Sequence, residues 1–172
     1  PRWTRHAHPR SHSFPMLDAI RLDHDWEFRR LDAHDAGVAW ARVSLPHSPF
    51  VADLDGREHW FGLCEYRRTV RQVLLQPGER CVLFVGAAMH TATVLVDGRS
   101  VARHEGGYLP FTADLTDALR DGCDHELVLR LDNQEAADVP PGKPYTELDF
   151  CWFGGLYRSV ELRRYPALHI TD

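Results

Sequence analysis

Short runs in which apolar and polar side chains alternate are the main pattern of this sequence. Between residues 126 and 132, Leu127, Leu129 and Leu131 alternate with Val128 and Arg130. A period of two residues is that of a β-strand, because successive side chains point to opposite faces of a sheet. The pattern predicts a strand whose leucine face enters the core, with Leu129 buried, while the other face meets a second layer or water.

A hairpin is predicted around the dipeptide Asp97-Gly98. Residues 91–96 and 99–103 read as strands, and a two-residue type I′ turn needs positive φ at both central positions, which Asp and Gly tolerate. The turn fixes the register of the two strands. We therefore expect Ala92, Val94 and Val96 on one face of the sheet and the residues between them on the other.

The remaining apolar runs are short and are separated by frequent turn-forming residues, which is typical of an antiparallel sandwich or barrel. We expect an all-β fold of eight or nine antiparallel strands, in which the first folded element begins near Trp26 and Phe28. A single helical turn is predicted within residues 112–119, capped by Thr112 or Asp114. Further strands are predicted at residues 66–74, 80–85, 155–163 and 167–171.

Residues 1–25 are predicted to form a flexible lead-in to a single domain over residues 26–172. The first fifteen residues contain prolines, serines and arginines with little apolar content. His6, His8 and His12 lie among them, and we interpret this group as incidental and not as a metal site. A chain of 172 residues buries roughly 70% of its unfolded surface, which is enough for a self-sufficient core.

Composition gives a broad class and disfavours some partners. With 44% hydrophobic and 26% charged residues, the sequence is that of an average soluble globular protein. Its formal net charge of −5 argues against a nucleic-acid partner, since that binding depends on clustered Lys and Arg. No apolar run approaches the roughly 20 residues that span a bilayer, and the first residues lack the apolar centre of a secretory signal. We therefore expect no membrane partner.

The four cysteines, Cys64, Cys81, Cys123 and Cys151, are scattered without a CxxC pair. This spacing predicts buried reduced thiols and indicates neither a zinc site nor a disulfide framework. Reduced thiols are usual in the cytoplasm, which is the expected location.

The segment at residues 140–162 contains the candidate binding chemistry. Its three prolines and the pair Gly154-Gly155 give the backbone a specific bend, and Asp149 lies there among aromatic side chains. A neutral sugar is usually held by aromatic faces and a few polar groups. The sequence has no GxSxG, HExxH or phosphate-binding glycine motif, and Glu147 with Asp149 makes no convincing catalytic pair. No catalytic residue is predicted.

Three blocks of sequence follow one another in a specific order. They are LPH at residues 45–47, EGGYLPFTADLT at residues 105–116 and PPGKPYTELDFCWFGGLYRSVEL at residues 140–162. Together they resemble the N-terminal sugar-binding domain of glycoside hydrolase family 2, and the letters DFCWFGGLYR are most similar to β-galactosidases. The resemblance implies a jelly-roll-like, galactose-binding-domain-like sandwich that helps to shape a sugar site in a much larger enzyme. The two catalytic glutamates of that family lie on a TIM barrel, which is absent from this chain.

The resemblance also implies which residues bind substrate. In the resembling β-galactosidases an aspartate before the GG(L/I)YR element contacts galactose hydroxyls or a bound cation, and by position this role falls on Asp149. Tyr145 and Trp152 are the aromatic candidates beside it. No cofactor is expected in this chain, and a cation is left open for the longer enzyme. The family's asparagine after the LPH turn is missing here, and four residues are open as substitutes: Asp53, Asp55, His59 and Trp60.

Other residues of the three blocks are interpreted as structural. We expect His47 to close a loop through a hydrogen bond, and His104 to act similarly. Arg158 is expected to brace the domain internally or against a neighbour. Residues 106–111 are expected to shape the core and a loop.

The leading hypothesis is an N-terminal sugar-binding domain of a β-galactosidase-like glycosidase, which is inactive alone and packs against the catalytic barrel. Carbohydrate and that barrel are the expected partners. Because β-glucuronidases and β-mannosidases use similar domains, the sugar is open. The alternatives are a free-standing carbohydrate-binding module and a structural domain that serves only interdomain packing.

Overall fold

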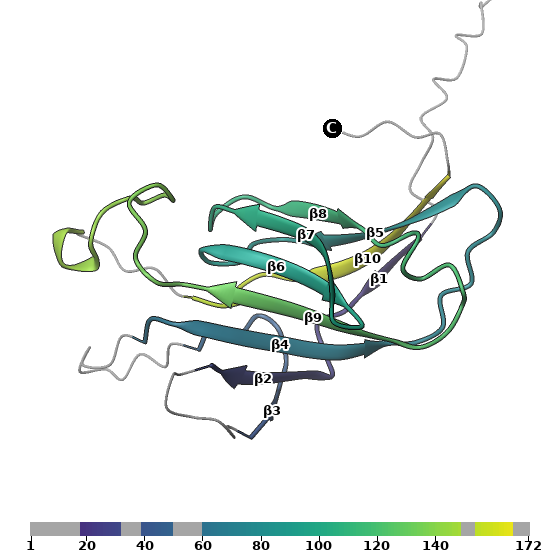
Figure 1. Ribbon diagram of the computed structural model, residues 1–172, viewed down its shortest axis with the longest axis horizontal. Coiled ribbons are helices and arrows are strands. Elements are labelled where there is room, and N and C mark those ends of the chain that lie inside the picture. Colours follow the sequence, from purple (N-terminus) through teal and green to yellow (C-terminus); the bar gives the residue numbers. More distant parts are fainter. Residues whose placement is uncertain (1–17, 32–38, 50–59, 149–153, 167–172) are drawn as a thin grey trace, which may run out of the picture.

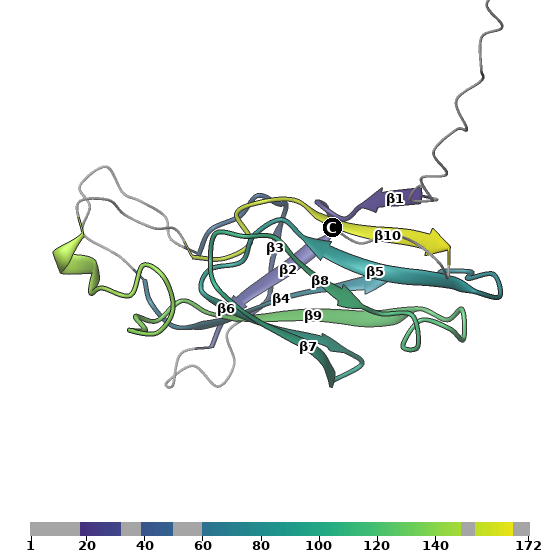
Figure 2. The ribbon, with the colours of Figure 1, turned by 90° about the horizontal axis from the view of Figure 1, so that it is seen from above.

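A computed structural model describes residues 18–31, 39–49, 60–148 and 154–166 of the chain. These residues form ten strands in two antiparallel sheets, which pack face to face as a sandwich (Figures 1 and 2). The all-β class expected from the alternating pattern is therefore confirmed, although the described residues form ten strands instead of the expected eight or nine. The described residues contain no helix with the length and apolar character needed to cross a membrane.

The smaller sheet has four strands in the order β1-β10-β5-β8, and the larger has six in the order β3-β2-β4-β9-β6-β7. The strands of the smaller sheet are β1 (Asp18–Arg21), β10 (Val160–Pro166), β5 (Glu79–Val85) and β8 (Phe111–Asp114). Those of the larger sheet are β3 (Ala41–Val43), β2 (Trp26–Arg30), β4 (Leu63–Val70), β9 (His125–Asp132), β6 (Thr91–Val96) and β7 (Arg99–Glu105).

The core lies between the sheets and is built by the alternation seen in the sequence. Leu127, Leu129 and Leu131 of β9 are at most 1% exposed. They face residues such as Leu83 and Leu162 of the smaller sheet, which belong to the same buried cluster. The predicted burial of Leu129 is confirmed.

The hairpin of β6 and β7 agrees with its predicted turn. Asp97 and Gly98 have φ values of 49° and 77°, as a type I′ turn requires. Ala92, Val94 and Val96 are buried, whereas the residues between them are half-buried on the outer face.

A histidine clamped by two aspartates fixes this turn to β9. His125 Nδ1 lies 2.6 Å from Asp97 Oδ2, and His125 Nε2 lies 2.7 Å from Asp121 Oδ1. Because carboxylates only accept hydrogen bonds, both ring nitrogens donate and the ring is an imidazolium. The bonds to Asp97 and Asp121 raise the pKa of His125. Asp97 also accepts a hydrogen bond from the backbone N–H of Glu126 at 2.9 Å.

The clamp is expected to make stability depend on pH. The raised pKa of His125 means that its contribution is complete below the ordinary value of 6.5 and is lost as pH rises through the raised pKa. The pKa of Asp97 is lowered mainly by its hydrogen bond from His125. The pKa of Asp121 is lowered mainly by its hydrogen bond from the Cys123 backbone N–H. The contribution of these two carboxylates is present above their usual 3.8 and is lost as pH falls through the lowered pKa values.

The stabilisation by the clamp is therefore greatest between about pH 4 and pH 6.5. Thermal unfolding of the parent and of His125→Asn, measured from about pH 5 to 9, checks this expectation. The difference in Tm between the two proteins should shrink as pH rises above 6.5. A difference that stays constant over this range contradicts the assignment.

The ordered structure begins earlier than the sequence predicts. Strand β1 pairs with β10 from Asp18 onward, so the expected start near Trp26 is wrong, and residues 18–25 are not a flexible lead-in. All four β1 residues are exposed, and so short a strand carries no periodic signal. Buried Asp23 fixes the next residues, because its carboxylate accepts hydrogen bonds from Ser159 Oγ and the Val160 N–H.

Three other predicted boundaries differ from the observed ones. Strand β4 is shifted toward the N-terminus relative to residues 66–74, and β10 begins at Val160 instead of residue 155. The expected helical turn is preceded by β8 and is a single turn in which the Leu119 N–H donates to the Leu115 carbonyl at 3.0 Å. Asp114 caps it by accepting the Thr116 N–H. The strand predicted at residues 167–171 lies outside the described residues.

The cysteine prediction is confirmed for two residues and wrong for one. Cys64 and Cys81 are buried free thiols, and burial raises the pKa of both, that of Cys81 to about 12. Cys123 is exposed because it follows the turn at Asp121 on the surface. Cys151 lies outside the described residues.

Candidate functional site

The loops at one end of the sandwich meet around the segment 154–159. Met89 and His47 donate backbone N–H groups to the carbonyls of Gly155 (3.2 Å) and Leu156 (2.8 Å). The Gly86 N–H donates to the Ser159 carbonyl at 3.0 Å. The chain that leaves the candidate loop is thus joined to two neighbouring loops before β10 begins.

The two glycines allow this close approach. Gly155 has a φ of 88°, and a Cβ there would lie 2.6 Å from Pro49 Cδ and 2.8 Å from the His47 carbonyl oxygen, and would overlap the Tyr66 hydroxyl. A Cβ on Gly154 would overlap the Asn133 side chain. The backbone at Gly154 and Gly155 therefore lies directly against the side chains of Asn133 and Tyr66, where there is no room for a further side chain.

His47 has the structural role expected of it. Its Nδ1 lies 2.8 Å from the Tyr66 hydroxyl, and its ring packs 4.8 Å from that of Phe28. Burial lowers the pKa of His47, so the ring is neutral and one nitrogen can share the hydroxyl proton. The loop around residue 47 is closed by this contact and by the backbone bond to Leu156.

Asn133 is a buried anchor that sequence reasoning missed. It is 2% exposed, its Oδ1 accepts the Gly62 N–H at 2.7 Å, and its Nδ2 donates to the Trp60 carbonyl at 3.0 Å. Both ends of the amide are used, so this residue does not replace the missing asparagine of the family. Trp60, the one open substitute inside the described residues, packs its ring 4.9 Å from the Arg30 guanidinium.

Residues 106–110 form a second loop at this end. Gly107 leaves room for the Met89 side chain, and its carbonyl accepts a hydrogen bond from the Tyr157 hydroxyl. Arg158 donates to the Tyr108 carbonyl at 3.3 Å, which confirms an internal brace. The hydrogen bond expected of His104 is not formed with any described residue. The His104 ring stacks on Phe111 at 4.3 Å, and its buried Nε2 has no partner in the described part of the chain.

The predicted substrate-binding residues are only partly described. Tyr145 begins the 3₁₀ turn η1 (Tyr145–Glu147), which lies at the same end as the loops above (Figure 1), but its side chain lies outside the description. Asp149 and Trp152 fall in residues 149–153, also outside it, as do Asp53, Asp55 and His59. The structure thus places the two flanks of the candidate loop at one end of the sandwich. Among the described residues there is no group of three His, Cys, Asp or Glu side chains that could hold a metal ion.

The described residues thus form a two-sheet β-sandwich domain whose proline- and glycine-rich loops gather at one end, a fold that hosts many functions. Residues 62–166 match the family described as "Glycosyl hydrolases family 2, sugar binding domain". The chain belongs to this family.

Similar proteins carry two enzyme names. The chain is 29% identical over 164 residues to a β-galactosidase of Thermoanaerobacter pseudethanolicus, covering 90% of this chain and 22% of that protein. It is 34% identical over 146 residues to a β-glucuronidase of Paenibacillus borealis, covering 76% and 24%. The crystal structure of a Bacteroides uniformis β-glucuronidase superposes with a TM-score of 0.70 at 26% identity, over 87% of this chain and 18% of that one. The chain therefore spans about a fifth to a quarter of these relatives.

Proposed function

We propose that this domain forms one wall of the sugar site in a longer retaining glycosidase, where it adds binding contacts and no bond-breaking group. The family match over residues 62–166, in a chain that covers 22–24% of its curated relatives, carries this proposal. A β-galactoside is the proposed substrate, and a β-glucuronide is the alternative that the relatives support. The catalytic barrel of the longer enzyme is the proposed partner.

Within this wall, Asp149 is the proposed ligand of sugar hydroxyls or of a bound cation, with Tyr145 and Trp152 beside it. The proposal is supported by the fixed backbone on both sides of the loop, namely η1 before it and Gly155 after it. We also propose a cytoplasmic location, which the free buried thiols of Cys64 and Cys81 support.

The purified 172-residue chain provides the first test. It is expected to release no nitrophenol from nitrophenyl β-galactoside or β-glucuronide, because the two carboxyl groups of retaining hydrolysis lie elsewhere. Titration with galactose or glucuronic acid should give a Kd of roughly 1 mM or weaker. Hydrolysis by this chain contradicts the proposal, and a micromolar Kd favours a free-standing carbohydrate-binding module.

In the longer enzyme, Asp149→Asn is expected to lower kcat/KM roughly 10- to 100-fold, the loss of a hydrogen bond to a charged group. The Tm of the domain should stay nearly unchanged. Glu147→Gln, an exposed carboxylate on η1, is the matched control and should retain the parent kinetics. If Asp149→Asn has the same kinetics as the parent enzyme, the result favours the alternative of a domain that serves only interdomain packing.

A further inference from the structure

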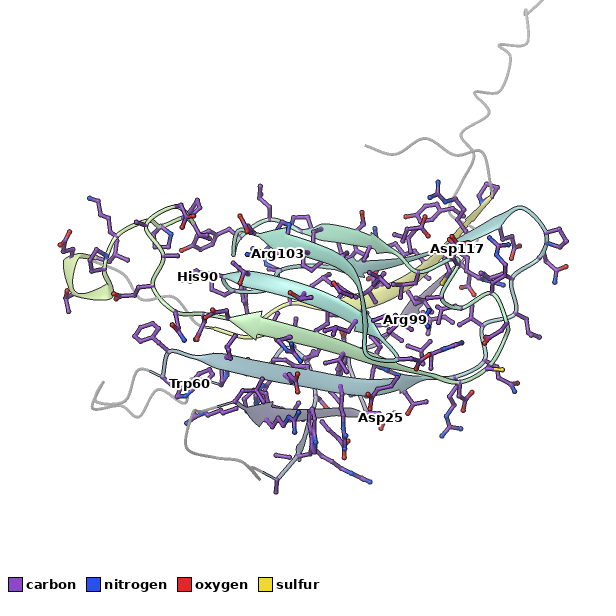
Figure 3. The ribbon with its side chains drawn as sticks, viewed as in Figure 1. Asp25, Trp60, His90, Arg99, Arg103 and Asp117 are labelled. Atoms are coloured by element: carbon purple, nitrogen blue, oxygen red, sulfur yellow. The ribbon has the colours of Figure 1, made fainter. Side chains whose placement is uncertain are left out.

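A groove between the two sheets opens at the opposite end of the sandwich from the candidate loop. Its volume is about 880 Å³, and it is lined by β1, β2, β3, β4, β10 and the segment that follows β4. In Figure 3, Asp25 of the groove lies beside the start of β2, whereas Trp60 and His90 lie at the other end of the molecule. The groove is therefore separate from the proposed sugar site.

The strand order explains why the sandwich is open here. The larger sheet has six strands and the smaller has four. Their edge strands β7 and β8 contact each other, so the unequal strand number falls on the side of β1. Strand β1 is the last strand of the smaller sheet, and among the described residues no strand pairs with its far edge.

Apolar side chains remain accessible in the groove. Ile20 of β1 is paired with Leu162 of β10, so both point to the same face of the sheet. Leu162 is 2% exposed, but Ile20 is 48% exposed. Leu74, on the segment after β4, lines the same groove and is 70% exposed. These two accessible apolar side chains in one groove indicate a surface that a further apolar side chain can cover.

The groove carries more positive than negative side chains. It is lined by five arginines and three acids. Arg67 pairs with Glu27 at 2.7 Å, and Arg164 pairs with Asp18 at 3.4 Å. The other three arginines of the groove, Arg42, Arg68 and Arg71, form no ion pair with the described residues. The remaining acidic residue of the groove is Asp25.

Arg68 is the most constrained of these arginines. It donates to the carbonyls of Leu22 and His24 at 3.0 and 2.9 Å, and its buried Nε has no hydrogen-bond partner among the described residues. The charge of Asp25 acts on it without forming an ion pair. Arg42 and Arg71 are exposed and are free to pair with anions from outside the domain.

We propose that this groove binds an extended acidic segment from elsewhere in the same longer polypeptide. An apolar side chain of the segment lies between Ile20 and Leu74, and its carboxylates pair with Arg42 and Arg71. The free edge of β1 favours an extended backbone, because an edge strand offers unpaired N–H and C=O groups to another strand. The proposal rests on the proposed function only in that the chain is part of a longer protein.

The test is an NMR titration of the ¹⁵N-labelled 172-residue chain with the acetylated and amidated hexapeptide Glu-Val-Asp-Leu-Glu-Val. We expect amide shifts in β1 and in residues 71–75, and weaker binding as salt is raised. The peptide Lys-Val-Lys-Leu-Lys-Val has the same apolar groups and the opposite charge, and it should cause no such shifts.

The double variant Arg42→Glu/Arg71→Glu is expected to bind the acidic peptide at least tenfold more weakly, or about 1.4 kcal/mol. Arg99→Glu is the matched control, because Arg99 is an exposed arginine on β7, the opposite edge strand of the larger sheet. The absence of shifts, equal binding of the basic peptide, or a self-associated chain that covers the groove overturns the proposal. Sugar titration of the same sample tests the other end of the domain separately.

Discussion

Replacement of Leu129 by alanine is expected to lower the free energy of unfolding by about 2–5 kcal/mol. Leu129 is fully buried in β9, between Tyr66 of β4 and Val94 of β6 in the strand register. Both neighbouring strands are hydrogen-bonded to β9, so they cannot close on the space that the side chain leaves. The cavity between the sheets then adds to the lost transfer free energy.

Urea unfolding followed by circular dichroism measures this loss. Leu109→Ala is the matched control, since Leu109 is 71% exposed on the loop after β7, and its stability should change by less than about 0.5 kcal/mol. Equal stability of Leu129→Ala and the parent would place the leucine face of β9 outside the core.

Gly155→Ala is expected to cost about 2–5 kcal/mol, from backbone strain and overpacking together. At a φ of 88° an L-residue is strained, and the added methyl group meets Pro49 Cδ and the His47 carbonyl at 2.6 and 2.8 Å. The carbonyl is backbone and cannot rotate away. The contact between His47 and Tyr66 should therefore be disturbed along with the stability of the domain.

Gly98→Ala separates the two causes of this loss. Gly98 has a similar φ of 77°, but no atom lies within 4 Å of the position of its Cβ. This variant should lose only the strain of the left-handed backbone, about 1–2 kcal/mol. If thermal unfolding shows equal losses for the two variants, close approach is not what requires glycine at position 155.

Local signals made parts of the fold predictable. The β6–β7 hairpin followed from Asp97-Gly98 and the alternation on either side, because both act within a few residues. Strands β1 and β3 have four and three residues, too few to show a period, and they form because β10 and β2 offer hydrogen-bonding edges. The predicted start of β10 at residue 155 was wrong. Glycine permits an extended strand as well as the bent backbone observed at Gly154 and Gly155, so the sequence does not distinguish the two.

For the candidate site, the sequence identified the glycine pair and the role of His47, but not the partners that explain them. Asn133 was not among the candidates that the sequence offered. Its side chain forms hydrogen bonds with the backbone of Gly62 and Trp60, which precede it in the sequence by 71 and 73 positions. No local sequence pattern predicts a contact over such a separation. Which side chains would touch a sugar depends on residues 149–153, which lie outside the described structure.

The backbone bonds of Gly155, Leu156 and Ser159 have a practical consequence. Their partners belong to other loops of the sandwich, so these bonds align the strand that follows. We therefore expect that residues 140–153 can be exchanged between relatives while the rest of the sandwich keeps its shape. Chimeras that carry residues 140–153 from a β-galactosidase or from a β-glucuronidase would show how much this segment contributes to the preference for one sugar over the other.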